Sequence, residues 1–264
     1  MPPAKRKPRT YNLDKTRTAV LTQFGAVRKA VESLTPEQLA APTRLGDWTV
    51  RELAAHITMA AGAVARGLAA AGPGKAELRP QDWPMTSAPY AEDIDAYVRG
   101  LAADHDLATL YAEAAQGLER ALAEHSGDAL VANRTGHMTL ADYLVTRTVE
   151  LIVHTDDLNA ALPGLDIPYD RQALAACARI LADALATKAP GASTEVRIPP
   201  YAVVQCVEGP RHTRGTPPNV VETDPLTWIR LATGRTSWST AVGEALVSAS
   251  GERADLAGLL PIMA

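Results

Sequence analysis

The chain has 264 residues, of which 47% are hydrophobic and 21% are charged. This length accommodates one large domain or two ordinary ones, and the composition is that of a globular protein rather than a disordered one. The net charge of -4 argues against a general nucleic-acid binder. The two cysteines form no CxxC pair, which excludes a cysteine-based zinc cluster and fits a reducing compartment. We therefore expect a cytoplasmic protein.

The first eleven residues are predicted to form a basic, flexible tail. Lys5, Arg6, Lys7 and Arg9 occur there with no acidic residue, and such a run before a folded domain is usually a solvated arm. The tail lacks the apolar run of a signal peptide. No later stretch is expected to be long and uncharged enough to span a bilayer.

Residues 12–165 are predicted to form a four-helix bundle. Apolar residues recur at helical spacing over four long segments, and Thr49 and Glu52 have the spacing of a capping box. Four long helices with a long crossover loop are typical of this architecture. The expected helices cover residues 14–34, 48–71, 91–125 with a break near 104, and 139–162, with a short helical turn at 35–39 and a Gly/Pro-rich loop at 72–90.

The pattern changes after residue 165. One more amphipathic helix is followed by short alternating runs, which are typical of strands. Short strands mixed with helices indicate a smaller α+β domain over residues 166–264. The expected helices cover residues 170–188 and 223–231, and the expected strands cover 195–198, 202–207 and 219–222.

The helix at 139–162 carries a polar stripe. Tyr143, Arg147, Glu150, His154 and Asp157 follow one another in steps of four, three, four and three residues, so they share one face of the helix. Apolar residues cover most of the remaining circumference, which places this stripe inside the bundle. Buried charges are costly unless they are paired or bind a metal.

Glu150 and His154 lie one turn apart, so both can reach a single ion. His56 is the best candidate for a third ligand, because its own helix also turns it inward. Two imidazoles and one carboxylate leave an open coordination position, as in catalytic zinc sites and in non-haem iron sites. Arg147 and Asp157 are then candidates for orienting and balancing the ligands.

The same residues have a structural interpretation. Glu150 could form a buried ion pair with Arg147, and His154 could be a hydrogen-bonded core histidine. The residues alone leave this alternative and the metal site at similar weight. No serine-nucleophile or nucleotide-binding motif occurs in a credible context, and Cys177 lies in an apolar helix, as a core residue does.

Two segments of the chain are GDWTVRELAAH at 46–56 and RTVELIVHTDDL at 147–158. Together they resemble the mycothiol-dependent maleylpyruvate isomerase family, which belongs to the DinB-like metal-binding bundles. In this family a helix opens at a tryptophan and carries a ligand histidine, and a later helix carries Glu-x-x-x-His followed by Asp-Leu. The resemblance implies zinc held by His56, Glu150 and His154, with the thiol of mycothiol at the open position.

The C-terminal part contains PRHTRGTPPNVVETDP at 210–225, continues through Trp228 to Arg235, and ends with 247–251 and 256–261. These segments resemble the sterol-carrier-protein-like domain that often follows this bundle, with the last two as its last strand and helix. It implies that an arginine of this domain holds a substrate carboxylate. Arg211 and Arg214 are the first candidates, and spacing does not separate them from Arg230 and Arg235.

These features predict a metal-dependent enzyme that activates mycothiol for isomerisation of a small electrophile or for transfer to it. The alternative is a non-catalytic carrier of an apolar ligand with a structural or vestigial metal site. A regulatory protein that uses its basic tail is a weaker alternative. The polar stripe favours the enzyme, because a carrier needs no polar groups in the core of its bundle.

Overall fold

The computed structural model describes residues 9–86, 88–209 and 218–263. Within these ranges the chain divides into two compact units. The bundle unit comprises Asn12–Pro80 and Pro89–Ala173. The sheet unit comprises the described parts of 1–11, 81–88 and 174–264. The division falls within helix α7 (Arg171–Lys188).

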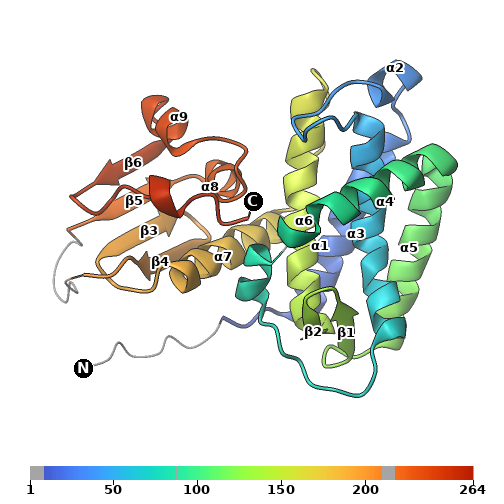
Figure 1. Ribbon diagram of the computed structural model, residues 1–264, viewed down its shortest axis with the longest axis horizontal. Coiled ribbons are helices and arrows are strands. Elements are labelled where there is room, and N and C mark those ends of the chain that lie inside the picture. The colour runs from blue at the N-terminus through green and yellow to red at the C-terminus, as the bar shows by residue number, and fades with distance from the viewer. Residues whose placement is uncertain (1–8, 87, 210–217, 264) are drawn as a thin grey trace. The chain divides into compact units, whose positions relative to one another are not determined.

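Four long helices form the core of the bundle unit, and a fifth, α4, packs on α3 (Figure 1). The four are α1 (Leu13–Val31), α3 (Val50–Ala70), α5 (Leu107–Glu124) and α6 (Leu140–Ala161), and α4 spans Ala91–Asp104. The predicted break near residue 104 is confirmed, since α4 ends there and Asp106 caps α5. Helix α6 is the central one, because sixteen of its 22 residues are buried.

Capping residues set where these helices begin. Thr49 and Glu52 form the predicted capping box of α3, and Thr139 caps α6. The short turn is also confirmed as α2 (Pro36–Leu39), which Thr35 caps. The Gly/Pro-rich loop contains two 3-10 turns, Pro80–Met85 and Ala88–Tyr90.

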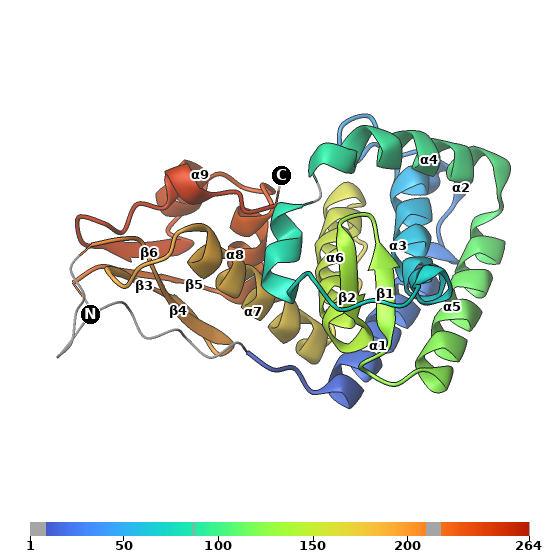
Figure 2. The same cartoon turned by 60° about the horizontal axis from the view of Figure 1, so that its bottom comes forward.

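A β-hairpin between α5 and α6 was not predicted. Strands β1 (Leu130–Asn133) and β2 (Gly136–Thr139) pair antiparallel at one end of the bundle (Figure 2). The hairpin packs closely on α3 at Gly67, where an added Cβ would lie 2.5 Å from a methyl of Val131 and 2.6 Å from the carbonyl oxygen of Ala132. Only glycine fits here without displacing the hairpin.

The sheet unit contains a four-stranded mixed sheet in the order β4-β3-β5-β6. Pairs β3–β4 and β5–β6 are antiparallel, whereas β3–β5 is parallel. Alternate residues of β3 and β4 are buried, and α7 and α8 lie on one side of the sheet (Figure 2). The strands are β3 (Thr194–Ile198), β4 (Ala202–Cys206), β5 (Val220–Thr223) and β6 (Val247–Ser250).

Helix α8 (Pro225–Ala232) begins at the cap Asp224, and its Trp228 is buried and donates a hydrogen bond to the carbonyl oxygen of Ala178 at 3.2 Å. Helix α9 (Trp238–Gly243) was not predicted. The segment expected to be the last helix is a single 3-10 turn, Ala257–Leu259, since a proline follows it closely.

Two further expectations concerned the basic tail and membrane-spanning segments. Arg9, placed in the basic tail, forms an ion pair with Asp183 of α7 at 2.8 Å. We expected no segment to be long and uncharged enough to span a bilayer, but α3 is long and apolar enough to do so by length and composition alone. Of its most apolar window, 61% is buried inside the protein, as in the core helix of a soluble bundle.

Candidate functional site

Helix α6 brings the polar stripe into the interior of the bundle unit. His154, Arg147 and Asp157 are buried, and the Glu150 side chain is 13% exposed. The helical spacing that predicted one shared face therefore predicted their placement correctly. The stripe makes a polar interior on a helix that is otherwise packed in apolar surroundings.

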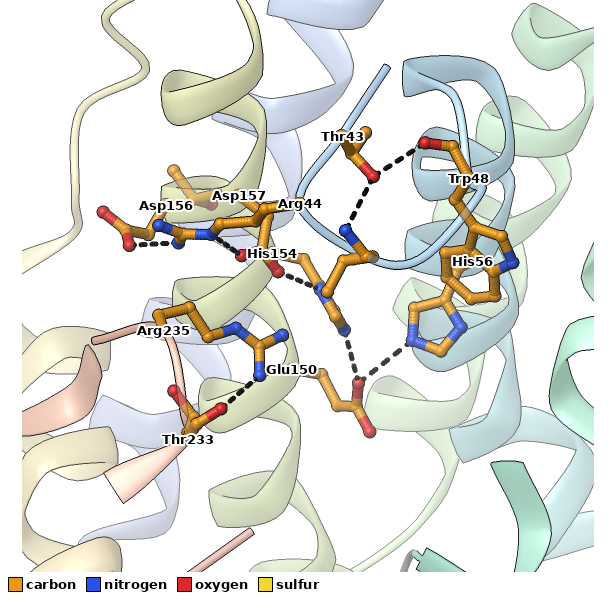
Figure 3. A network of polar contacts seen from close by, with 12 residues as sticks. Thr43, Arg44, Trp48, His56, Glu150, His154, Asp156, Asp157, Thr233 and Arg235 are labelled. Atoms are coloured by element: carbon orange, nitrogen blue, oxygen red, sulfur yellow. Dashed lines mark hydrogen bonds and ion pairs between the residues drawn. The ribbon is translucent and has the colours of Figure 1, made fainter. Parts of the chain in front are cut away.

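His56 of α3 faces this stripe. Its Nε2 lies 3.3 Å from Oε2 of Glu150, and the Nε2 of His154 lies 3.3 Å from the same oxygen. The two imidazole rings meet edge to face, with centroids 4.6 Å apart. Figure 3 shows dashed lines from one oxygen of the Glu150 carboxylate to both rings. One potential ligand atom from each residue lies within 4.8 Å of the other two.

The donor set fits a divalent metal. Metal–ligand bonds of about 2.0–2.1 Å in a tetrahedral zinc site place neighbouring ligand atoms about 3.3 Å apart. The two distances to Glu150 have this length. Two imidazole nitrogens and one carboxylate oxygen also form the ligand set that catalytic zinc sites and non-haem iron sites use.

Burial and hydrogen bonding shift the pKa of each of the three groups. Burial opposes ionisation of Glu150, but hydrogen bonds with His154 and His56 and the charge of Arg147 hold its pKa well below the ordinary value. Burial lowers the pKa of His56. Burial also acts to lower the pKa of His154, but hydrogen bonds to Asp157 and Glu150 outweigh it and raise that pKa. The site thus offers an ionised carboxylate and a neutral His56, as metal ligation requires.

Asp157 contacts the far side of the His154 ring. Its Oδ2 accepts a hydrogen bond from Nδ1 of His154 at 2.9 Å, and its side chain is fully buried. A carboxylate at Nδ1 fixes a proton there, so Nε2 is the ring atom of His154 that is left to bind a metal.

Arg147 contacts Glu150 less closely than the histidines do. Its Nη2 lies 3.7 Å from Oε1 of Glu150, its Nη1 donates to the carbonyl oxygen of Ala60 at 3.2 Å, and its guanidinium lies 4.5 Å from the ring centre of Tyr143. The ion pair between Glu150 and Arg147, which we considered as an alternative to a metal site, is therefore present. Its 3.7 Å distance is longer than the distances from Glu150 to His56 and His154.

Two residues near the site were not singled out from the sequence. Arg44 forms ion pairs with Asp156 at 2.5 Å and with Asp157 at 2.6 Å. The Trp48 ring packs on His56 with centroids 5.3 Å apart. The tryptophan was visible as part of the 46–56 segment, but no spacing rule connects Arg44 to aspartates that lie 112 and 113 positions away.

We expected an arginine of the C-terminal part to hold a substrate anion. Arg211 and Arg214 lie outside the described residues. Arg230 and Arg235 belong to the sheet unit, where Nη1 of Arg235 donates to the carbonyl oxygen of Thr233 at 2.7 Å.

The fold and the site together define the class of this protein: a helical bundle in whose interior two histidines and a glutamate converge. The family model described as the mycothiol maleylpyruvate isomerase N-terminal domain matches residues 20–159. The chain belongs to this family. A second model, described as a bacterial SCP ortholog, matches residues 170–262, which agrees with the sterol-carrier-like resemblance of the C-terminal part.

Solved structures show the same fold over nearly the whole chain. A crystal structure of the mycothiol-dependent maleylpyruvate isomerase is 17% identical, with a TM-score of 0.60, and the match covers 94% of this chain and 97% of that one. A histidine-to-alanine mutant of that enzyme is 16% identical, with a TM-score of 0.59 and the same coverage. A search of proteins with curated functions finds no significant match.

Proposed function

We propose that this protein is a zinc- and mycothiol-dependent isomerase that acts on a small electrophile of the maleylpyruvate type. The convergence of His56, Glu150 and His154 in the bundle carries this proposal, because their spacing suits a tetrahedral metal with one open position. The family to which the chain belongs suggests mycothiol as the thiol, and the names of the solved relatives suggest the class of substrate.

The three side chains would hold the metal through the Nε2 atoms of the two histidines and a carboxylate oxygen of Glu150. When bound, zinc with an open position would lower the pKa of a coordinated thiol, so that a thiolate is available at neutral pH. The two cysteines of the chain are buried and do not offer such a thiol themselves.

Asp157 and Arg147 would act on the ligands and not on the substrate. Asp157 fixes the proton of His154 at Nδ1 and directs the other nitrogen inward. Arg147 holds a positive charge near Glu150, which keeps that carboxylate ionised. The carboxylates of Glu150 and Asp157 would offset the charge of the bound metal.

A substrate carboxylate would need a cationic partner outside the triad. Arg211 and Arg214 are our candidates in the C-terminal part, with Arg230 and Arg235 as further ones. Guanidinium groups bind carboxylates through two parallel hydrogen bonds, which gives orientation as well as affinity.

Transfer of the thiol to the electrophile, without its release, is the alternative reaction at the same site. A non-catalytic carrier is the alternative function, and the match of residues 170–262 to a bacterial SCP ortholog is the observation that favours it. In that case the metal would be structural or vestigial, and the C-terminal part would bind an apolar ligand.

The test is an isomerisation assay on the zinc-loaded chain. Maleylpyruvate should be isomerised with mycothiol, at a rate far above that without thiol, and His56→Ala should abolish the thiol-dependent rate. Accumulation of a thiol adduct would indicate the transferase. A zinc-loaded wild type with no thiol-dependent turnover would refute the enzyme, and saturable binding of a fluorescent fatty acid would then support the carrier.

A further inference from the structure

The loop of residues 42–49, which precedes α3, contacts His56 directly and reaches His154 through Asp157. We infer that this loop is a positioning element for the site: Arg44 orients His154 through Asp157, and Trp48 orients His56 by packing on its ring. The inference rests on the proposed function, because positioning matters only if the histidines bind a metal.

The loop is closed on itself by backbone contacts. Pro42 and Thr49 form an isolated β-bridge. The amide and the hydroxyl of Thr43 both donate to the carbonyl oxygen of Trp48, at 2.9 and 2.8 Å. Gly46 has a φ of +57°, a conformation that glycine adopts without strain. These contacts hold the loop backbone in one conformation, which fixes the positions from which its side chains extend.

Arg44 extends from this loop to α6. Its Nη2 lies 2.5 Å from Oδ2 of Asp156 and its Nε lies 2.6 Å from Oδ1 of Asp157. The two aspartate side chains are 3% and 0% exposed, whereas that of Arg44 is 29% exposed. Buried carboxylates are costly without a counter-charge, so Arg44 makes an ionised Asp157 tenable at this position.

Asp157 uses its two oxygens separately. Oδ1 accepts from Arg44, and Oδ2 accepts from Nδ1 of His154 at 2.9 Å. A continuous chain of hydrogen bonds therefore runs from the loop through Asp157 to His154 (Figure 3). Removing Arg44 would remove one of the hydrogen bonds that fix the Asp157 carboxylate, and this change loosens the His154 ring.

His56 has no equivalent hydrogen bond. Its Nδ1 is buried and has no hydrogen-bond partner among the described residues. Its ring is instead packed against Trp48, at 5.3 Å between centroids and an angle of 48°. The Trp48 indole is itself fixed, because its Nε1 donates to Oδ1 of Asp95 in α4 at 2.6 Å.

The loop thus orients one ligand by hydrogen bonding and the other by packing. Arg44 and Trp48 are four residues apart in one closed loop, while the two histidines that they orient belong to two different helices. Since ligand geometry decides zinc affinity, a change in either loop residue should weaken the site without removing a ligand.

The first experiment measures zinc affinity of the full chain by chelator competition, together with the visible spectrum of the cobalt-substituted protein. Arg44→Gln should weaken zinc binding about 10-fold or more, the range seen when groups that orient metal ligands are lost, and should alter the cobalt spectrum. Arg44→Lys should recover part of the affinity. Arg28→Gln is the matched control, since Arg28 forms an exposed ion pair with Glu32 on α1.

A double-mutant cycle separates positioning from general destabilisation. If Arg44 acts through Asp157, Arg44→Gln should change zinc affinity little in an Asp157→Asn background. Trp48→Leu tests the packing of Trp48 on His56 and remains informative if Arg44→Gln fails to fold. A melting curve of the metal-free Trp48→Leu protein confirms its folding. This variant too should weaken zinc binding and alter the cobalt spectrum.

Wild-type zinc affinity and cobalt spectrum in both Arg44→Gln and Trp48→Leu would overturn the inference while the proposed metal site stands. Equal effects of Arg44→Gln with and without Asp157 would also overturn the route through Asp157. A wild-type chain that binds no zinc would refute the proposed metal site itself, and the inference would fall with it.

Discussion

Asp157 accepts a hydrogen bond from Nδ1 of His154 across 2.9 Å, one turn further along the same buried helix. This contact settles which nitrogen of His154 faces Glu150 and His56. It also explains why two carboxylates occur so close together in the core, since Glu150 and Asp157 lie on opposite sides of one imidazole ring. The pH dependence of zinc binding follows from this arrangement.

The affinity for zinc should fall as the pH falls. A metal ligand must lose its proton, and a histidine ordinarily does so near pH 6.5. In the metal-free protein burial lowers the pKa of His154, but the hydrogen bonds to Asp157 and Glu150 outweigh it and raise that pKa. Protons therefore compete with zinc from above the ordinary histidine range downwards, while His56, whose pKa burial lowers, releases no proton there.

Chelator competition at a series of pH values checks this. Zinc affinity should drop by about 10-fold for each pH unit over which one proton is released. Constant affinity between pH 8 and pH 5.5 would mean that zinc does not bind through histidine.

The two cysteines should be unreactive in the native protein. Both are buried, burial raises the pKa of Cys206 to about 11, and burial also raises the pKa of Cys177. Because the thiolate is the reactive form, a thiol-specific chromogenic reagent at pH 8 should label neither residue until denaturant is added. Rapid labelling of the folded chain would show an accessible internal thiol, and the proposed reaction would then not require an external thiol.

Replacement of Gly67 should destabilise the fold. An added Cβ would lie 2.5 Å from a methyl of Val131 and 2.6 Å from the carbonyl oxygen of Ala132, so Gly67→Ala should cost about 1–3 kcal/mol of unfolding free energy. Gly25→Ala is the control: Gly25 lies in α1 with nothing within 4 Å of an added Cβ, and the change should stabilise by about 0.5–1 kcal/mol. Urea denaturation of both variants gives the comparison, and equal midpoints would contradict the close packing of the hairpin.

The helices and the polar stripe could be predicted because local pattern determines them. Apolar spacing identified α1, α3 and α6, and the same spacing put Glu150, His154 and Asp157 on one face. The hairpin at 130–139 was missed, since its two strands have four residues each and only partial burial. Such short runs do not differ in pattern from a loop.

The surroundings of the site could not be predicted. Arg44 contacts residues 112 and 113 positions away, and Trp48 reaches Asp95 across 47 positions. Contacts at such separations follow from how the helices pack, and no local periodicity encodes them. The spacing of the polar stripe and the resemblance to a known family both pointed to the ligand set, but neither pointed to the contacts of Arg44.

The central claim is that His56, Glu150 and His154 hold a metal. The most direct test is the zinc content per chain of untagged protein, purified after growth with ample zinc. Wild type should contain about one zinc per chain. The His105→Ala control, which changes an exposed histidine at the end of α4, should contain the same amount. His56→Ala should lose most of the zinc while keeping its helical circular dichroism, because the apolar core of the bundle remains. Equal, near-zero zinc in all three proteins would contradict the account and leave only the buried ion-pair cluster.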